Sequence, residues 1–326
     1  MKNILVTGVK GQLGSEIKNH VISQVDNDFN FIFTDVEDYD ITNYAEGEKI
    51  FSENNVDIVI NCAAYVDTNK AELPEEKDKV FAINTVGPMN LARLCKKFNS
   101  TLIHISTDYV FDGSKTSPYL PEDSKLIFDE GGKAINGPKT FYGLTELLAE
   151  QEIIQSECNY IIIRTSWLYS EYGSNNFVKK IMRKCLASYK ENNIFVVDDE
   201  IGTPTNAADL ADFIVKDIIF AGKENLMGVY HYTNEGVCSR ADFARIIARE
   251  FRKQCFNEIY ILNQDYNLTP ITYVPSSYFN SKIERPLYSV LDKHKTIDTF
   301  KIKIKPWDTS LTQCIQKIVM REGMKF

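Results

Sequence analysis

The sequence predicts an α/β protein with a doubly wound parallel sheet and a smaller second lobe. Three observations support this prediction. The first 170 residues alternate short apolar runs with longer helical patterns, a glycine-rich loop joins the first run to the first helix, and the pattern changes after about residue 170. Alternating strands and helices are typical of repeated βαβ units around a parallel sheet.

The strands expected in the first half are almost continuously apolar, as strands buried on both faces of a parallel sheet are. They are Asn3–Thr7, Phe29–Thr34, Ile58–Asn61, Thr101–Ile105 and Tyr160–Arg164. The helical patterns between them cover Gln12–Ser23, Ala82–Lys97 and Tyr142–Ile154. Right-handed crossovers wind such units into a doubly wound sheet.

The second half shows a different order of elements and no linker or repeat. Helices are expected near Asn176–Leu186, Asn206–Phe220, Ser239–Arg252 and Asp308–Met320, and strands at Ile194–Val197 and Val229–Tyr232. We therefore expect residues 1–170 to form the dinucleotide-binding domain, completed by parts of residues 190–230. Residues 171–326 are expected to form mainly an intercalated substrate-binding lobe.

Composition excludes several classes of protein. The chain has 45 acidic and 37 basic residues, a formal net charge of −8, which argues against a nucleic-acid binder or a polybasic membrane-surface protein. No apolar run is long enough to span a membrane, and the N-terminus enters a strand pattern without a leader. The seven cysteines form no CxxC pair and have no metal-like spacing to the four histidines. We expect a cytoplasmic protein with reduced thiols, no metal and a small-molecule substrate, and a homodimer is one expected assembly.

The first expected strand runs into Gly8–Gly14, a GxxGxxG loop that opens a helix. Glycines allow a tight turn there, and a pyrophosphate can approach the helix N-terminus, where N–H groups and the macrodipole favour an anion. Asp35 ends the second strand, where an acid can accept hydrogen bonds from a ribose. This order predicts a Rossmann-type dinucleotide site, and the alternative is a glycine-rich turn without a ligand. The residues that it places at the cofactor are Gly8, Gly11, Gln12, Leu13, Gly14 and Asp35.

The choice between NADH and NADPH stays open. The carboxylate of Asp35 would repel the 2′-phosphate of NADPH, whereas Lys10 in the loop partly offsets this repulsion. Asp40 and Ile41 follow at a point where the chain could sandwich an adenine. A helix N-cap at the same place is the alternative.

The fourth expected strand ends in Ile105–Gly113, with the sequence ISTDYVFDG, and Tyr142 begins the next helix with YGLTE. Hydroxyls at the carboxyl end of a parallel strand lie where open α/β sheets bind ligands. With these motifs the chain resembles the extended short-chain dehydrogenase/reductase superfamily and, within it, the dTDP-4-dehydrorhamnose reductase family. Further segments similar to that family, in the same order, are Asn61–Tyr65, Lys70–Glu72, Arg164–Trp167, Asn176–Val178, Asp198–Thr205, Gly228–His231 and Arg285–Pro286.

The resemblance implies a two-lobed reductase of dTDP-rhamnose biosynthesis, in which NADPH or NADH reduces the C4 ketone of a nucleotide-linked 6-deoxy-4-keto sugar. Thr107 would hydrogen-bond the carbonyl, and Tyr142 would protonate its oxygen. The resemblance adds Ala63, Ala64 and Tyr65 to the cofactor site. It places Tyr109, Trp167, Asn176, Arg240 and Arg285 at the sugar, and core packing is the alternative for the two aromatic residues.

The chain departs from the family pattern Tyr-x-x-x-Lys, because the fifth residue is Glu146. Positions i and i+4 share one helix face, so a carboxylate is expected where an ammonium would lie beside Tyr142. At ~5 Å and an effective dielectric near 20, a unit charge contributes about 3 kcal/mol, or about two pKa units. The changed sign makes Tyr142 harder to ionise. A reductase needs tyrosine in its protonated form, so we expect slower turnover.

Two further departures leave alternatives open. Arg240 stands where the family has a tryptophan, and the segment between Pro118 and Phe141 is longer than in the family. This segment shows no periodicity and is expected to be a long functional loop that can act as a lid. Lys133 or Lys139 in it could replace the missing ammonium. Glu146 leaves open a regulatory homologue without turnover, and Arg240 leaves open a different 4-keto sugar.

Overall fold

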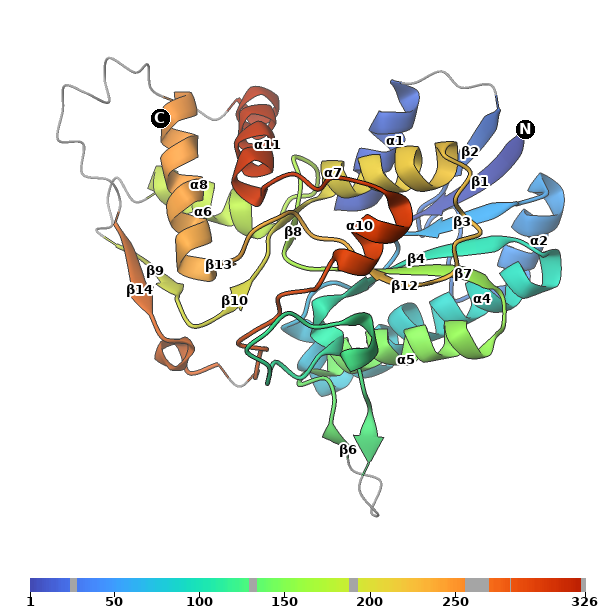
Figure 1. The fold of residues 1–326 in the computed structure, drawn as a ribbon, viewed down its shortest axis with the longest axis horizontal. Coiled ribbons are helices and arrows are strands. Elements are labelled where there is room, and N and C mark those ends of the chain that lie inside the picture. The colour runs from blue at the N-terminus through green and yellow to red at the C-terminus, as the bar shows by residue number, and fades with distance from the viewer. Residues whose placement is uncertain (24–27, 129–133, 188–192, 256–269, 282, 324–326) are drawn as a thin grey trace.

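The centre of the protein is a six-stranded parallel sheet with the strand order β2–β1–β3–β4–β7–β12 (Figure 1). The computed structural model describes residues 1–23, 28–128, 134–187, 193–255, 270–281 and 283–323. The strands of the sheet are β1 (Lys2–Thr7), β2 (Phe29–Phe33), β3 (Ile58–Asn61), β4 (Thr101–Thr107), β7 (Asn159–Thr165) and β12 (Gly228–His231). Every neighbouring pair is parallel, which confirms the predicted doubly wound fold.

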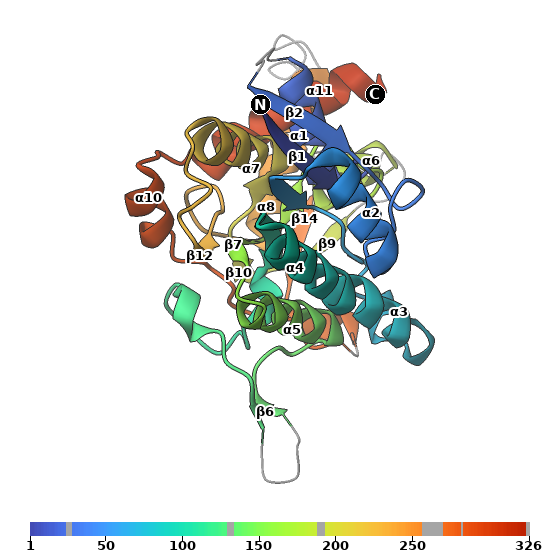
Figure 2. The ribbon, with the colours of Figure 1, turned by 90° about the vertical axis from the view of Figure 1, so that its right-hand side faces the viewer.

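Helices cover both faces of this sheet (Figure 2). On one face lie α1 (Gln12–Ile22) and α7 (Ala207–Asp212), and on the other lie α2 (Tyr44–Asn54), α4 (Gly87–Phe98) and α5 (Phe141–Gln155). Successive side chains of a strand point to opposite faces. Ile4, Ile60 and Ile103 therefore pack towards α1 and α7, while Leu5 and Leu102 pack towards α2 and α4. Burial on both faces explains the continuous apolar runs of the sequence.

A second lobe lies beside the sheet and has its own apolar core. Its helices are α6 (Phe177–Ala187), α8 (Arg240–Cys255) and α11 (Trp307–Glu322), and its strands β9 (Ile194–Val197) and β14 (Ile271–Val274) pair in parallel (Figure 1). Phe243 packs at the centre of this core against Tyr169 and Phe177. The remaining short elements are α3 (Lys77–Phe81), β8 (Leu168–Tyr169), β10 (Ile201–Gly202), β11 (Thr205–Asn206), β13 (Cys238–Ser239) and α10 (His294–Phe300).

The segment between Pro118 and Phe141 contains a short antiparallel hairpin, where a loop without regular structure was expected. Its strands are β5 (Ile127–Phe128) and β6 (Ala134–Asn136), and the hairpin projects from the body of the protein (Figures 1 and 2). The Lys139 ammonium pairs with Glu284 at 3.3 Å, not with Glu146. The hypothesis that Lys139 replaces the missing ammonium is therefore wrong, and Lys133 lies outside the described residues.

A buried ion pair joins α5 to the sheet. The Arg164 guanidinium on β7 donates to both carboxylate oxygens of Glu150 on α5, at 2.8 Å and 2.6 Å. Ser106 donates to the same carboxylate at 2.5 Å. Arg164 also donates to the carbonyl of Pro121 and to the hydroxyl of Ser124, both at 2.7 Å. The pair thus connects the sheet, α5 and the segment that precedes the hairpin.

We expect Arg164→Met to lower the free energy of unfolding by about 3–5 kcal/mol, because it leaves the Glu150 charge buried without a partner. Glu150→Leu should destabilise the protein for the converse reason. The double variant should lose clearly less than the two single losses added together, since neither charge then remains. Urea unfolding followed by circular dichroism measures all four proteins. Additive losses would contradict this description of the pair.

Candidate active site

Two hydroxyls meet at the carboxyl end of β4. Thr107 is the last residue of β4, and Tyr142 lies in the first turn of α5. Thr140 begins this helix, because its hydroxyl accepts a hydrogen bond from the Gly143 N–H at 3.0 Å. The Tyr142 hydroxyl lies near the Thr107 hydroxyl, which lowers the pKa of Tyr142. The ring of Tyr109 packs edge-on against the Tyr142 ring, with 5.6 Å between the centroids. A group that can bind a carbonyl thus adjoins a group that can protonate it.

The close approach of α5 depends on Gly143. A Cβ at this position would lie 2.2 Å from the backbone oxygen of Tyr109. A larger residue would push the start of α5, and Tyr142 with it, away from the end of β4. The glycine after the tyrosine in the YGLTE motif therefore serves the geometry of the site.

Burial raises the pKa of Tyr142 well above its ordinary value of 10, and the Glu146 carboxyl raises it further. The neighbouring Thr107 hydroxyl acts in the opposite direction and lowers the pKa of Tyr142. Tyr142 therefore keeps its proton at neutral pH, as a general acid must before the reaction.

Glu146 lies one turn further along α5 and has 2% of its surface exposed. Burial raises the pKa of its carboxyl to about 8, the Glu150 carboxylate adds to this effect, and the neighbouring Tyr142 hydroxyl opposes it. Desolvation thus favours the neutral acid at this position, where the sequence analysis expected a carboxylate.

Asp108 is a further acid of the site that the sequence analysis did not assign. Its Oδ1 accepts a hydrogen bond from the Thr107 hydroxyl at 3.2 Å. Its Oδ2 is buried and has no hydrogen-bond partner among the residues that the structure describes. Burial raises the pKa of Asp108 to about 6, while hydrogen bonds and the positive charge of Arg240 lower it. A buried acceptor without a partner next to these hydroxyls can accept a hydrogen bond from a ligand.

The glycine-rich loop has the shape of a dinucleotide cradle. Gly8 has φ +66°, and a Cβ there would lie 2.7 Å from the Ala63 nitrogen. A Cβ on Gly14, in the first turn of α1, would lie 2.3 Å from the Gly8 oxygen. Gln12 and Leu13 begin α1 and lie between Gly11 and Gly14. The loop is thus close-packed against the end of β3 and the N-terminus of a helix, which fits a pyrophosphate group.

Asp35 borders this loop as the sequence predicts. Its carboxylate accepts hydrogen bonds from the N–H groups of Lys10 and Val36 at 2.8 Å and 2.9 Å. The Lys10 ammonium pairs with Glu37 at 2.8 Å, and both side chains are largely exposed. Asp35 and Lys10, whose opposite charges left the cofactor preference open, therefore both lie at the rim of the loop.

The segment after β3 lies against the glycine loop at Ala63 and continues through Ala64 to Tyr65. The Tyr65 N–H donates to the Asn84 side chain at 2.6 Å, and the Asn84 amide donates back to the Tyr65 carbonyl at 3.1 Å. These bonds hold the segment beside the loop. The cofactor contacts expected for its three residues stay predictions.

Asp40 and Ile41 have structural contacts of their own. The Asp40 carboxylate accepts hydrogen bonds from the N–H and the hydroxyl of Thr42, at 2.9 Å and 2.8 Å. Asn43, not Asp40, is the N-cap of α2. Ile41 is buried and packs close to Gly87 of α4. The adenine contact expected for Asp40 and Ile41 stays a prediction.

Trp167, Arg240 and Glu200 form a stack near the hydroxyls. The guanidinium carbon of Arg240 lies 3.5 Å from the centroid of a Trp167 ring, and its Nε pairs with Glu200 at 3.4 Å. The positive charge of Arg240 lowers the pKa of the buried Asp108 and Tyr109 side chains, which burial itself raises. Arg240 therefore brings a positive charge to the face of Trp167 and to the neighbourhood of Asp108 and Tyr109.

Asn176 uses its side chain within the protein. Its amide donates to Oε1 of Gln12 at 2.9 Å and to the carbonyl of Ser170 at 2.8 Å. Its oxygen accepts a hydrogen bond from the Lys179 N–H at 3.0 Å. Asn176 thus joins the start of α6 to the glycine loop, and its contact with a substrate stays a prediction.

Arg285 lies near the site and donates to the Asn69 side chain at 2.7 Å. Its positive charge lowers the pKa of Tyr109, which burial raises. The neighbouring Pro286 packs against Gly113, so that two motifs far apart in the sequence meet here. Substrate contacts of Tyr109, Trp167, Arg240 and Arg285 stay predictions as well.

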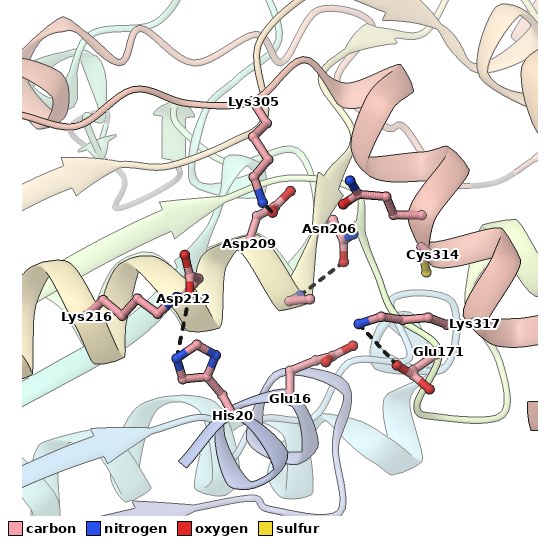
Figure 3. A pocket seen from close by; sticks show the side chains of 12 residues that line it. Glu16, His20, Glu171, Asn206, Asp209, Asp212, Lys216, Lys305, Cys314 and Lys317 are labelled. Atoms are coloured by element: carbon pink, nitrogen blue, oxygen red, sulfur yellow. Dashed lines mark hydrogen bonds and ion pairs between the residues drawn. The ribbon is translucent and has the colours of Figure 1, made fainter. Parts of the chain in front are cut away.

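A polar cavity of about 300 Å³ lies elsewhere, between α1, α7 and α11 (Figure 3). Its acidic and basic side chains pair with one another: Lys305 with Asp209 at 2.7 Å, and Lys317 with Glu171 at 3.6 Å (Figure 3). None of the predicted site residues lines it. We interpret the cavity as part of the contact between the two lobes.

Comparisons with known proteins agree with the fold and with the family resemblance of the sequence. The chain matches the family described as RmlD substrate binding domain over residues 1–320. The chain belongs to this family. It is 32% identical to a dTDP-4-dehydrorhamnose reductase from Aggregatibacter actinomycetemcomitans, over 95% of this chain and 97% of that protein. It is also 32% identical to the spore coat polysaccharide biosynthesis protein SpsK of Bacillus subtilis, over 97% and 98% of the two chains.

Solved structures of the family have the same fold. A dTDP-4-dehydrorhamnose reductase from Bacillus anthracis in complex with NADP superposes with a TM-score of 0.79 at 29% identity, covering 96% of this chain and 98% of that one. A related structure from Clostridium acetobutylicum gives a TM-score of 0.78 at 34% identity, with the same coverage. These matches confirm the family resemblance and the fold of a nicotinamide-dinucleotide-binding oxidoreductase.

Among the described residues, none of the helices combines the length and the apolar character that a membrane span needs. Within the same part of the chain, no three His, Cys, Asp or Glu side chains are grouped as a metal ion would require.

The packing of the glycine loop predicts a graded loss of cofactor affinity. Gly14→Ala should raise the Kd for NADPH at least about tenfold, because its methyl group would meet the backbone of Gly8 and Val9 and force the loop to move. Gly11→Ala meets only the Gly8 oxygen, at 3.1 Å, and should have a smaller effect. Quenching of protein fluorescence by NADPH measures both. Equal affinities in the native protein and Gly14→Ala would contradict this loop as the binding site.

The buried Glu146 predicts a pH dependence of stability. Its pKa is about 8 in the folded protein and near the ordinary 4.5 in the unfolded chain. A raised pKa stabilises the fold fully below about pH 4.5, and this contribution is lost as pH rises through 8. Each unit of the difference corresponds to roughly 1.4 kcal/mol, so the contribution amounts to a few kcal/mol. Urea unfolding between about pH 5 and 9 should show the native protein losing stability relative to Glu146→Gln. A constant difference between the two proteins would contradict the pKa assigned to Glu146.

Proposed function

We propose that the protein reduces the C4 ketone of a nucleotide-linked 6-deoxy-4-keto sugar with NADPH or NADH, and that dTDP-4-dehydrorhamnose is its substrate. The observation that carries this proposal is the adjacency of the Thr107 and Tyr142 hydroxyls at the carboxyl end of β4. Relatives named dTDP-4-dehydrorhamnose reductase support the choice of sugar.

The residues of the chain have distinct tasks in this reaction. A bound nicotinamide supplies the hydride that goes to C4. Thr107 donates a hydrogen bond to the carbonyl oxygen and orients it. Tyr142, which keeps its proton because it is buried, transfers that proton to the oxygen as negative charge develops there. The product is the 4-hydroxy sugar.

Binding is divided between the two lobes. Gly8, Gly14 and Asp35 hold the dinucleotide on the sheet side, through the cradle and the carboxylate described above. Tyr109, Trp167, Asn176, Arg240 and Arg285 are assigned to the nucleotide sugar on the other side. The unpartnered oxygen of Asp108 is suited to accept a hydrogen bond from a sugar hydroxyl.

Reduction of a different 4-keto sugar nucleotide is a second candidate, favoured by the charge of Arg240 on the face of Trp167. The relative kcat/KM values for a panel of dTDP-linked 4-keto sugars decide between the two. A regulatory homologue without turnover is the remaining alternative. It requires cofactor binding without reduction of any sugar in the panel.

Oxidation of NADPH and of NADH with enzymatically generated dTDP-4-dehydrorhamnose tests the proposal. The native protein should turn over, and Tyr142→Phe should reduce kcat about 10²- to 10⁴-fold, because it removes the general acid. Thr107→Val should reduce kcat about a hundredfold through loss of a donor to the carbonyl. Tyr160→Phe, at the opposite end of β7, is the matched control and should keep full activity. An unchanged rate in Tyr142→Phe, or no turnover in the native protein, would contradict the proposal.

A further inference from the structure

Glu146 is a buried carboxyl without a cation. It has 2% of its surface exposed, and no ion pair joins it to any described residue. Tyr142 lies one turn before it on the same face of α5, and Glu150 lies one turn after it. A carboxyl in such a place is strongly favoured to stay neutral, since an unpaired buried charge is costly.

The neighbouring ion pair determines which of the two acids on this face is charged. Glu150 accepts hydrogen bonds from Arg164 on both oxygens, and Ser106 adds a third. The remaining N–H groups of Arg164 bind Pro121, Ser124 and the ring nitrogen Nε2 of His231. Arg164 is thus engaged with other partners, and the charged Glu150 disfavours a second negative charge at Glu146.

We propose that Glu146 serves Tyr142 as a neutral carboxylic acid, which returns a proton to the tyrosine after the tyrosine has protonated the sugar oxygen. This inference rests on the proposed function. It gives Glu146 a different task from the lysine of the family, which would supply positive charge next to the tyrosine. Glu146 supplies a proton and acts through Tyr142, as a positioning residue.

Each proton transfer of this cycle breaks one O–H bond and forms another. The hydride adds to C4 of the sugar, and the electron pair of the carbonyl π bond moves to oxygen. The O–H bond of Tyr142 breaks as the O–H bond of the product forms. The phenolate then takes the proton of Glu146, whose O–H bond breaks, and the Glu146 carboxylate takes a proton from solvent. The sugar gains one hydride and one proton, and the protein returns to its starting state.

The direction of the second transfer follows from the two environments. Burial and the Glu146 carboxyl raise the pKa of Tyr142 well above 10, and the pKa of Glu146 is about 8. The phenolate is therefore the stronger base and takes the proton. Above about pH 8, Glu146 has no proton to give and its charge disfavours the phenolate formed during turnover.

Other titratable groups around α5 do not replace Glu146 in this task. His104 of β4 has its pKa lowered to about 4 by burial, so it is neutral at the working pH. Asp108 and Tyr109, which follow β4, act on the pKa of Tyr142 and not on that of Glu146. From α3, the Lys77 ammonium lies over the ring of Phe141 at the start of α5.

The remaining charged contact on this side comes from Glu72, which precedes α3 and accepts the Phe141 N–H at 2.7 Å. Neither Glu72 nor Lys77 shifts the pKa of Glu146. The groups that act on Glu146 are thus Glu150 and Tyr142, in addition to burial.

The pH profile of kcat tests the role in turnover, because the proton returns to Tyr142 after the sugar has been protonated. In the native protein the rate should fall about tenfold per pH unit above about pH 8, as Glu146 loses its proton. Glu146→Gln keeps a hydrogen-bond donor but has no proton to transfer, so its rate should be lower and this limb of the profile should be absent. Glu152→Gln, on the same helix, should keep the profile of the native protein. The same limb in Glu146→Gln as in the native protein would overturn the inference.

A measurement without substrate separates this inference from the proposed function. Difference infrared spectra of the protein between about pH 6 and about pH 10, with Glu146→Gln as the reference, should show a protonated carboxyl that disappears with a midpoint near pH 8. A midpoint below about pH 5 would overturn the inference whatever the turnover. Absence of turnover on every sugar with the midpoint intact would overturn the proposed function and the proton return that depends on it.

Discussion

The buried ion pair between Glu150 and Arg164 determines how α5 lies on the sheet. It ties the middle of the helix to β7, and the start of the helix, with Tyr142, then meets Thr107 at the end of the neighbouring strand. The same pair occupies the Arg164 cation and leaves Glu146, between the pair and the tyrosine, as an acid without a counter-ion. The position of the general acid and the protonation state of its neighbour thus depend on one interaction. Removing either partner would affect both, because a charge buried without its partner destabilises the local structure.

The parallel sheet brings the two halves of the candidate site together. The glycine loop follows β1, Ala63 follows β3, and Thr107 ends β4, so the proposed cofactor site and the two candidate hydroxyls lie along one edge. This is the edge at which open α/β sheets bind their ligands. The second lobe supplies Arg240 and, with Asn176 at the start of α6, contacts the glycine loop directly. In the proposed reaction the dinucleotide would bind at the glycine loop and the nucleotide sugar next to it, beside Thr107 and Tyr142.

The sequence predicted those parts of the fold that local pattern determines. The strands of the sheet and the glycine loop followed from apolar runs and spacing. Helix α2 was missed, because only Gly47 and Phe51 of its residues are buried and its apolar pattern is weak. The hairpin β5–β6 was expected as a loop, since its strands have two and three residues. The pairing of Glu150 with Arg164 could not be predicted, because it depends on how α5 packs on β7. The raised pKa of Glu146 could not be predicted either. Helix spacing shows which residues neighbour Glu146, but it does not show how deeply the carboxyl is buried.

Transfer of deuterium tests the central claim most directly. The protein would be incubated with dTDP-4-dehydrorhamnose and NADPH in which both hydrogens at C4 of the nicotinamide are deuterium, and the sugar product would be analysed by mass spectrometry and proton NMR. The product should contain one deuterium, bonded to C4 of the sugar. A reduced sugar without deuterium at C4, or no reduced sugar at all, would contradict the claim.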